Sequence, residues 1–152
     1  MPSLRTIPAD SPDALALVGA MVDHVVAVYG EERPGGPTAT PEELSPPGGC
    51  FVALYDDDGS TVLAGGGIKR LDDATGELKR MYVVPEAQGR GLSRVLLAGL
   101  EDAARQLGYR RLRLDTGDRQ QAARHLYATA GYSEVPAYNE NPYASYWAEK
   151  DL

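Results

Sequence analysis

The feature that most constrains the fold is a strand pattern that runs through a glycine-rich turn directly into a long amphipathic helix. The strand pattern covers residues 77–84 and ends at Pro85, and the turn occupies residues 88–93. The apolar stripe of the helix consists of Leu92, Val95, Leu96, Leu100, Ala103 and Leu107. Gly108 ends the helix pattern, and a short alternating strand follows at residues 111–115. A strand–helix–strand unit of this kind indicates an α/β fold.

The same turn predicts a phosphate-binding cradle. The first backbone N–H groups of a helix have no internal partners, and the helix dipole places positive potential there. Glycines allow a phosphate to approach the backbone, and Arg90 adds a positive charge. A surface loop whose glycines only turn the chain is the alternative. The dinucleotide pattern G-x-G-x-x-G fails at Arg94, and the Gly-Lys-Ser/Thr of a Walker motif is absent, so these residues leave the phosphate ligand open.

The whole chain, residues 1–152, is predicted to form one domain with a mixed, mostly antiparallel sheet of about seven strands and about four helices. Strands are expected over residues 4–7, 50–55, 61–71, 77–84, 111–115, 132–135 and 143–149, and helices over residues 12–29, from near Thr40, over 92–107 and over 120–130. The first helix presents a predicted core face of Leu15, Val18, Val22, Val25 and Tyr29. Three glycines at residues 65–67 predict a bulge or close backbone packing.

The composition and charge of the chain limit which partners, location and metal sites are expected. The formal net charge is −7 and the pI is about 4.8, which disfavours nucleic acid as a partner. No uninterrupted apolar run reaches membrane-spanning length and the first residues do not resemble a signal peptide, so no membrane association and a cytoplasmic location are expected. The single Cys50 is expected to be a buried apolar residue. His24 and His125 are both expected to be exposed, and no metal site is predicted.

Two motifs resemble signatures of the GNAT superfamily of N-acetyltransferases. The family's acetyl-CoA loop reads Gln/Arg-x-x-Gly-x-Gly/Ala, and Gln88, Gly91 and Ser93 occupy its positions. A second signature, Asn-x-x-Ala-x-x-Leu-Tyr-x-x-x-Gly-Phe, matches the frame of Gln120, Ala123, Leu126, Tyr127, Gly131 and Tyr132. Ser93, Gln120 and Tyr132 depart from the family's residues. The resemblance is specific over residues 77–132.

The resemblance implies acetyl-CoA as the cosubstrate and a split between two central strands that admits it. The pyrophosphate is expected on the N–H groups of Gly89, Arg90, Gly91, Leu92 and Ser93. The pantetheine arm is expected to pair with backbone near Tyr82 and Val83, as an added strand would. Gln120 and Arg124 are further expected contacts, although a solvated Arg124 is an equal alternative.

The resemblance also implies catalytic roles for Tyr127 and Glu77. Tyr127 corresponds to a tyrosine near the CoA sulfur, where it would hydrogen-bond or protonate the leaving thiolate; a plain core aromatic is the alternative. Glu77 lies eleven residues before Gln88, the offset of the general base in histone-modifying members. A solvent-facing glutamate is the alternative for Glu77, an ordered water is another base, and Asp115 is a second candidate.

The acceptor is expected to be a primary amine of a small molecule, selected by residues 29–49 and 136–142 and by one or two aromatic residues of the last strands. A protein lysine or N-terminus is the alternative acceptor, and a catalytically silent CoA-binding sensor is the alternative function. The sequence does not determine the oligomeric state; many relatives are dimers, and only this analogy suggests a homodimer.

Overall fold

A computed structural model describes residues 1–30, 39–117 and 121–152. The elements are β1 (Ser3–Ile7), α1 (Pro12–Tyr29), β2 (Cys50–Tyr55), β3 (Val62–Arg70), β4 (Thr75–Val83), the 3-10 helix η1 (Pro85–Ala87), α2 (Leu92–Gln106), β5 (Arg111–Thr116), α3 (Gln121–Thr129), β6 (Ser133–Glu134) and β7 (Tyr146–Asp151). The seven strands form one sheet in the order β1-β2-β3-β4-β5-β7-β6. All neighbouring strands are antiparallel except β4 and β5, which confirms the predicted mixed sheet.

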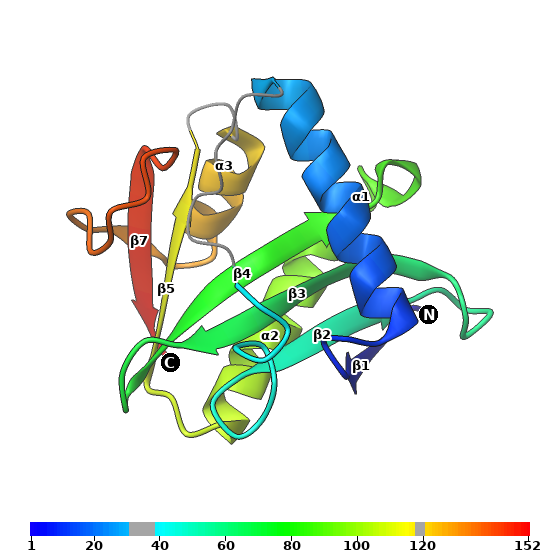
Figure 1. The fold of residues 1–152 in the computed structure, drawn as a ribbon, viewed down its shortest axis with the longest axis horizontal. Helices are drawn as coiled ribbons and strands as arrows, with labels where there is room; N and C mark the ends of the chain where they lie inside the picture. Colours follow the sequence, from blue (N-terminus) through cyan, green and yellow to red (C-terminus); the bar gives the residue numbers. More distant parts are fainter. Residues whose placement is uncertain (31–38, 118–120) are drawn as a thin grey trace.

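Helices cover both faces of the sheet. α2 and α3 contribute to the larger core on one face, and α1 packs on β3 and β4 from the other face (Figure 1). Every residue of β2 is buried: Cys50, Val52 and Leu54 belong to the larger core, and Phe51 belongs to the smaller core on the other face. A continuous apolar run is expected for a strand that is covered on both faces.

The predicted short helix near Thr40 is wrong. Thr40 and Glu43 do form the reciprocal bonds of a helix start, since each backbone N–H donates to the other's side-chain oxygen at 3.1–3.2 Å. The segment then forms only turns. Pro46 and Pro47 lack the N–H groups that a growing helix needs, and two glycines follow, so the described residues contain three α-helices rather than four.

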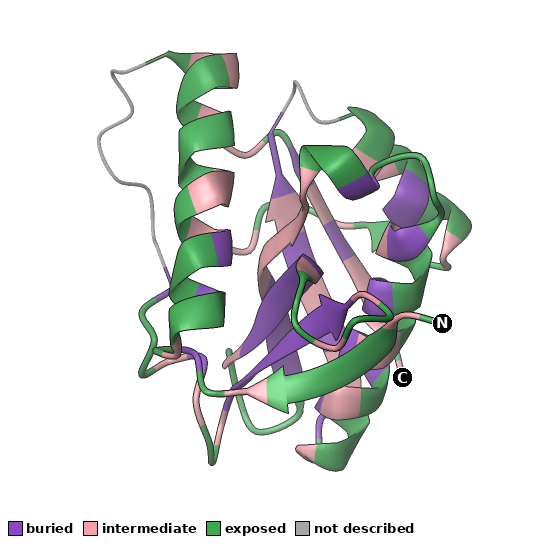
Figure 2. Cartoon of the chain, turned by 90° about the vertical axis from the view of Figure 1, so that its right-hand side faces the viewer, coloured by how far each residue is buried: buried purple, intermediate pink, exposed green. Residues whose placement is uncertain are grey.

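α1 has the predicted limits, but its core face is only partly the predicted one: Val18 packs against the smaller core, and other members of the face do not. Ser11 caps its start by accepting a bond from the Ala14 N–H at 3.4 Å. Leu15 and Val22, expected in the core, are 51% and 42% exposed, while Ala14 and Leu17 are buried. By length and composition alone this helix could cross a membrane. Here it lies along the sheet with its outer face exposed (Figure 2).

The three glycines of β3 determine how closely its neighbours approach. A Cβ atom at Gly65 would lie 2.4 Å from Leu17 of α1, so this glycine lets the helix approach the sheet. On β4 two residues, Arg80 and Met81, stand opposite the single Gly66, which is the predicted bulge. Arg80 takes a positive φ of 62° at this bulge.

β4 and β5 separate after Glu77, before β4 reaches the bulge. The two strands are paired at only three positions, Thr75–Arg111, Gly76–Leu112 and Glu77–Arg113. From there β4 and β5 diverge (Figure 1). The part of β4 beyond Glu77 therefore has an edge that is not paired with β5, which is the expected split between two central strands.

Candidate functional site

The separation of β4 and β5 opens a cavity of about 500 Å³, within the range of small-molecule sites. β4, the turn before α2, the first residues of α2, and α3 form its walls. The predicted site residues that line it are Tyr82, Val83, Gln88, Gly89, Gly91, Leu92, Ser93 and Tyr127. Residues from both sequence motifs thus meet around one opening.

The glycine-rich turn has the backbone that the sequence predicts for an anion cradle. Gly89 and Gly91 take positive φ angles of 79° and 74°, which favour glycine. Gly91 is the N-cap of α2 and provides no side-chain cap, so the first N–H groups of the helix stay available to a ligand. Gln88 fixes the turn to the sheet, because its Nε2 donates to the carbonyl oxygen of Val83 at 3.2 Å.

Tyr127 is a buried phenol at the junction of α3 and β4. Its hydroxyl lies 3.7 Å from the Met81 sulfur, a weak acceptor. Burial, with smaller contributions from Asp115 and Tyr146, raises the pKa of Tyr127 to about 12. The phenol is therefore protonated at neutral pH and can donate a hydrogen bond into the cavity.

Two predicted contacts, Arg90 and Arg124, do not line this cavity. Arg90 is exposed at the tip of the turn. The Arg124 guanidinium lies 4.8 Å from the centre of the Tyr146 ring, a cation–π contact. Gln120 is outside the described residues. The roles of all three toward a cofactor stay predictions.

A second cavity, of about 210 Å³, adjoins the first and shares with it His24, Met81, Tyr82 and Tyr127. Its other lining residues include Arg80 on β4, Asp115 on β5, and Asn141 and Tyr143 from the loop before β7. Asn141 belongs to residues 136–142, which are expected to select the acceptor; the role of this cavity as the acceptor pocket stays a prediction.

His24 is the residue that the sequence reasoning missed. It is exposed as expected, yet it lines both cavities, and its ring centroid lies 5.7 Å from that of Tyr82. Only the observed packing face of α1 reveals this position. His125 is exposed and borders neither cavity.

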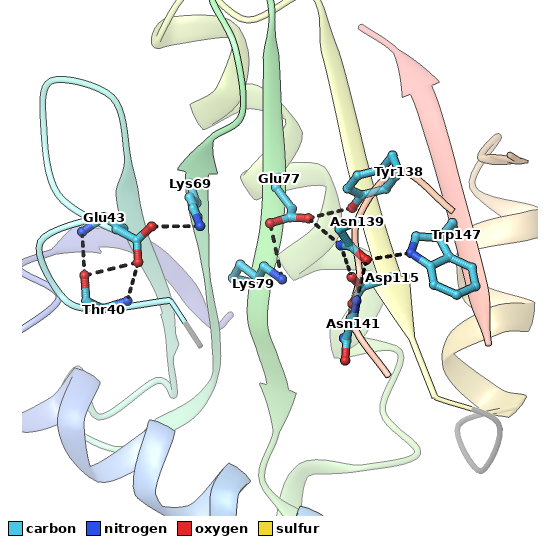
Figure 3. Close-up of polar contacts among 10 residues, drawn as sticks. All are labelled: Thr40, Glu43, Lys69, Glu77, Lys79, Asp115, Tyr138, Asn139, Asn141 and Trp147. Atoms are coloured by element: carbon cyan, nitrogen blue, oxygen red, sulfur yellow. Dashed lines mark hydrogen bonds and ion pairs between the residues drawn. The ribbon is translucent and has the colours of Figure 1, made fainter. Parts of the chain in front are cut away.

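Glu77 is buried, with 3% of its surface exposed, so the solvent-facing alternative is wrong. Its carboxylate lies 3.2 Å from Lys79 Nζ and accepts a hydrogen bond from the Tyr138 hydroxyl at 2.7 Å (Figure 3). Burial and the nearby Glu77 raise the pKa of Tyr138, so this phenol remains a donor. Glu77 is not among the lining residues of either cavity.

Asp115, in contrast, does line the second cavity. Its two oxygens accept hydrogen bonds from the amides of Asn139, at 2.6 Å, and Asn141, at 3.3 Å. The Asn139 amide also lies 3.5 Å from Glu77, so one amide connects the two carboxylates (Figure 3). Trp147 fixes that amide by donating to its oxygen at 2.9 Å.

Other reactive side chains do not add to this site. Burial raises the pKa of the Cys50 thiol to about 11, so this cysteine stays protonated in the core as expected. Among the described residues, no three His, Cys, Asp or Glu side chains are grouped as a metal ion would need.

Comparisons with known proteins connect this geometry to a family. The family model described as "Acetyltransferase (GNAT) family" matches residues 19–132. YjgM of Escherichia coli K12, an uncharacterized N-acetyltransferase, is 29% identical over 145 residues, covering 88% of this chain and 83% of YjgM. Mycothiol acetyltransferase of Beutenbergia cavernae is 36% identical over 85 residues; the match covers 56% of this chain but only 29% of that protein.

Solved structures share the fold. A GNAT-family acetyltransferase from Staphylococcus aureus Mu50 superposes with a TM-score of 0.81 at 15% identity, covering 99% of both chains. The PaiA N-acetyltransferase of Thermoplasma acidophilum, solved in complex with coenzyme A, gives 0.75 at 16% identity and covers 100% of this chain and 99% of its own. With a family model that spans three quarters of its length, this chain belongs to the GNAT family of acetyltransferases.

Proposed function

We propose that this acetyltransferase moves an acetyl group from acetyl-CoA to the primary amine of a small molecule, by direct attack of the amine on the thioester. The observation that carries the proposal is the pair of adjoining cavities, one beside the glycine-rich turn and one beside Asp115, which share Tyr127. Two substrates in adjoining cavities would meet at the shared residues. Such proximity supplies much of the rate in reactions of two substrates.

The larger cavity fits the donor. The pyrophosphate of acetyl-CoA would be held by the N–H groups of residues 89–93, where the uncapped helix start and two glycines leave the backbone accessible. The pantetheine arm would extend along the open edge of β4 near Tyr82 and Val83. The coenzyme A named with the Thermoplasma structure supports this choice of donor.

The reaction needs a base, a hydrogen-bond donor to the oxyanion, and a group that stabilises the leaving thiolate. As the amine nitrogen forms its bond to the acetyl carbon, Asp115 or Glu77 accepts the amine proton directly or through water. A backbone N–H near Val83 would stabilise the tetrahedral oxyanion. When the carbon–sulfur bond breaks, Tyr127 donates a hydrogen bond to the thiolate.

The contacts support Asp115 best as the base, and they support Glu77 as a residue that helps to position Asp115. Asp115 borders the smaller cavity, whereas Glu77 reaches that cavity only through the Asn139 amide. In this arrangement the two residues named from sequence as candidate bases belong to one hydrogen-bonded network.

Calorimetric titration with acetyl-CoA, with NAD and ATP as controls, tests the donor. We expect micromolar binding of acetyl-CoA alone, and loss of about tenfold in affinity for Gly91→Ala, because the new Cβ and the left-handed backbone disturb the cradle. Gly108→Ala is the matched control, since Gly108 also has a positive φ, at the other end of α2, with open space around its missing Cβ. Equal effects of the two variants, or no binding, would contradict the donor site. Binding without thiol release for any amine would instead indicate the CoA-binding sensor.

A further inference from the structure

We propose that the acceptor is an amine that also carries a carboxylate, as an α-amino acid does, and that Arg80 binds this carboxylate. The inference deepens the proposed function and rests on it, because it names the class of molecule that the smaller cavity takes. It starts from the one arginine that lines this cavity among the described residues.

Arg80 is a half-buried cation without a protein partner in the described part of the chain: no carboxylate lies within 4.0 Å of it, and no hydrogen bond or ring contact involves its guanidinium. The other half-buried basic residues in the described ranges are engaged. These are Lys69 with Glu43, Lys79 with Glu77, Arg111 and Arg113 with Glu149, Lys150 with Glu101, and Arg124 over Tyr146. Burial lowers the pKa of Arg80, as expected for a cation that has lost water and gained no anion.

The backbone holds Arg80 in an unusual conformation. Its φ of 62° is the only positive φ of a non-glycine residue in the described chain, and it lies in the bulge of β4 against β3, three residues after the last β4–β5 pair. Residues other than glycine take this conformation at a cost, and such residues cluster where a side chain must be directed to a function. At this bulge Arg80 lines the smaller cavity.

Two side chains of opposite charge line the smaller cavity without forming an ion pair. Asp115 lines it together with Arg80, yet the two groups form no ion pair. Asn139 and Asn141 hold the Asp115 carboxylate in place. A zwitterion matches this arrangement, with its amine toward Asp115 and its carboxylate toward Arg80. Guanidinium groups bind carboxylates with two parallel hydrogen bonds, which orients the ligand as well as binding it.

A simple amine or a lysine side chain matches the cavity less well. Neither has a carboxylate near the reacting nitrogen, so either would leave Arg80 desolvated and unpaired in the complex. A buried polar group without a partner weakens binding.

Thiol release measured with the standard α-amino acids and with their carboxamides tests the inference. The amide retains the amine and side chain and removes only the charge. For the preferred side chain, we expect kcat/KM to be about 10- to 100-fold higher with the acid than with the amide. Arg80→Gln should remove this preference by lowering kcat/KM for the acid alone, and Arg80→Lys should retain part of it.

Arg80→Gln and Arg80→Lys both keep a non-glycine residue at the positive φ, so the two variants have the same backbone requirement. Arg110→Gln is the control for loss of a positive charge, because Arg110 is exposed and borders neither cavity. Equal rates for acids and amides in the wild-type protein, or an acid preference that survives Arg80→Gln, would overturn the inference.

A binding measurement separates this inference from the proposed function. Calorimetry in the presence of CoA should compare N-acetyl amino acids with their amides. We expect the wild-type protein to bind only the acids, and we expect Arg80→Gln to lose this binding. If acetyl-CoA binds and neutral amines are acetylated while no acid binds or reacts, the inference fails and the proposed function stands. If acetyl-CoA itself does not bind, the proposed function fails first.

Discussion

Tyr127 shows how burial defines the chemistry of one residue. With its pKa raised to about 12, the phenol is a far weaker acid than a thiol, whose pKa is near 8.5. Complete proton transfer from Tyr127 to the departing thiolate is therefore uphill by several pKa units. A hydrogen bond that strengthens as the carbon–sulfur bond breaks is the role that this environment supports.

We predict that Tyr127→Phe lowers kcat by about 10- to 100-fold and leaves the Kd for acetyl-CoA within about twofold. Because the folded-state pKa is raised, the phenol of the wild-type protein stays protonated until the pH approaches 12. Its ionisation should therefore cause no loss of kcat between neutral pH and about pH 10. Steady-state kinetics and calorimetry measure both quantities.

Tyr132→Phe is the control for Tyr127→Phe. Tyr132 is also buried, and its ring contacts that of Tyr127, but its hydroxyl donates to Glu101 at 2.9 Å and it borders neither cavity. This variant should be less stable but should retain kcat per folded molecule. If both variants lose the same activity, Tyr127 acts through packing alone.

Asp115 and Glu77, the two carboxylates connected by the Asn139 amide, can be distinguished by charge removal. We predict that Asp115→Asn lowers kcat/KM by about 100-fold or more, because it removes the base that borders the acceptor. Glu77→Gln should cost about tenfold, since it only alters the Asn139 amide that positions Asp115. The reverse order of losses in amine-acetylation kinetics would assign the base to Glu77.

At the scale of elements, the sequence predicted strands better than helix faces. Turn residues bracket the strands on both sides, so β2 was predicted residue for residue and β3, β4 and β5 within one or two residues of each end. α1, in contrast, carries apolar residues around most of its surface. Contact between Leu17 and the sheet at Gly65 selects the face, and this contact joins residues far apart in the chain.

The same reasoning explains what could be predicted of the site. Gln88, Gly91 and Tyr127 are in local motifs, so their spacing reveals them. Arg80, Asp115 and His24 come together only because β4 bulges, β5 diverges and α1 packs through the face that carries Ala14 and Leu17. No local pattern signals that juxtaposition.

An ion pair between half-buried Lys150 and buried Glu101 joins α2 to β7. Lys150 Nζ lies 3.1 Å from both oxygens of Glu101, which is 9% exposed and also accepts from Tyr132. Lys150→Met would leave this carboxylate without its cation. We predict a loss of roughly 1–3 kcal/mol in the free energy of unfolding, with the Kd for acetyl-CoA unchanged.

Chemical denaturation of Lys150→Met should be compared with that of Arg105→Met. Arg105 pairs with Asp102 on the same helix, but both side chains are largely exposed. Removing an exposed pair should change stability by less than about 1 kcal/mol. Equal losses in the two variants would mean that the burial of Glu101 adds nothing to the strength of its pair.

At the scale of the molecule, the sheet has two parts, β1–β4 and β5–β7, that are joined at three β4–β5 pairs. The proposed donor site contacts β4 of the first part and α3, the helix that connects β5 to β6 of the second part. Acetyl-CoA would therefore close the opening in the sheet while leaving the cores unchanged.

Hydrogen exchange can detect this closure. With acetyl-CoA at about 100 times its Kd, binding adds about 2.7 kcal/mol to stability and should raise Tm by about 5–10 °C for a chain of this size. Beyond this global effect, we predict added protection at the backbone amides of residues 79–83, on the open edge of β4, and of residues 89–93. Amides of β1 and β2, which are remote from the cavity, should gain only the protection that follows from the higher global stability. A uniform gain over all strands would show that acetyl-CoA stabilises the fold without pairing with β4, and would move the pantetheine arm away from that edge.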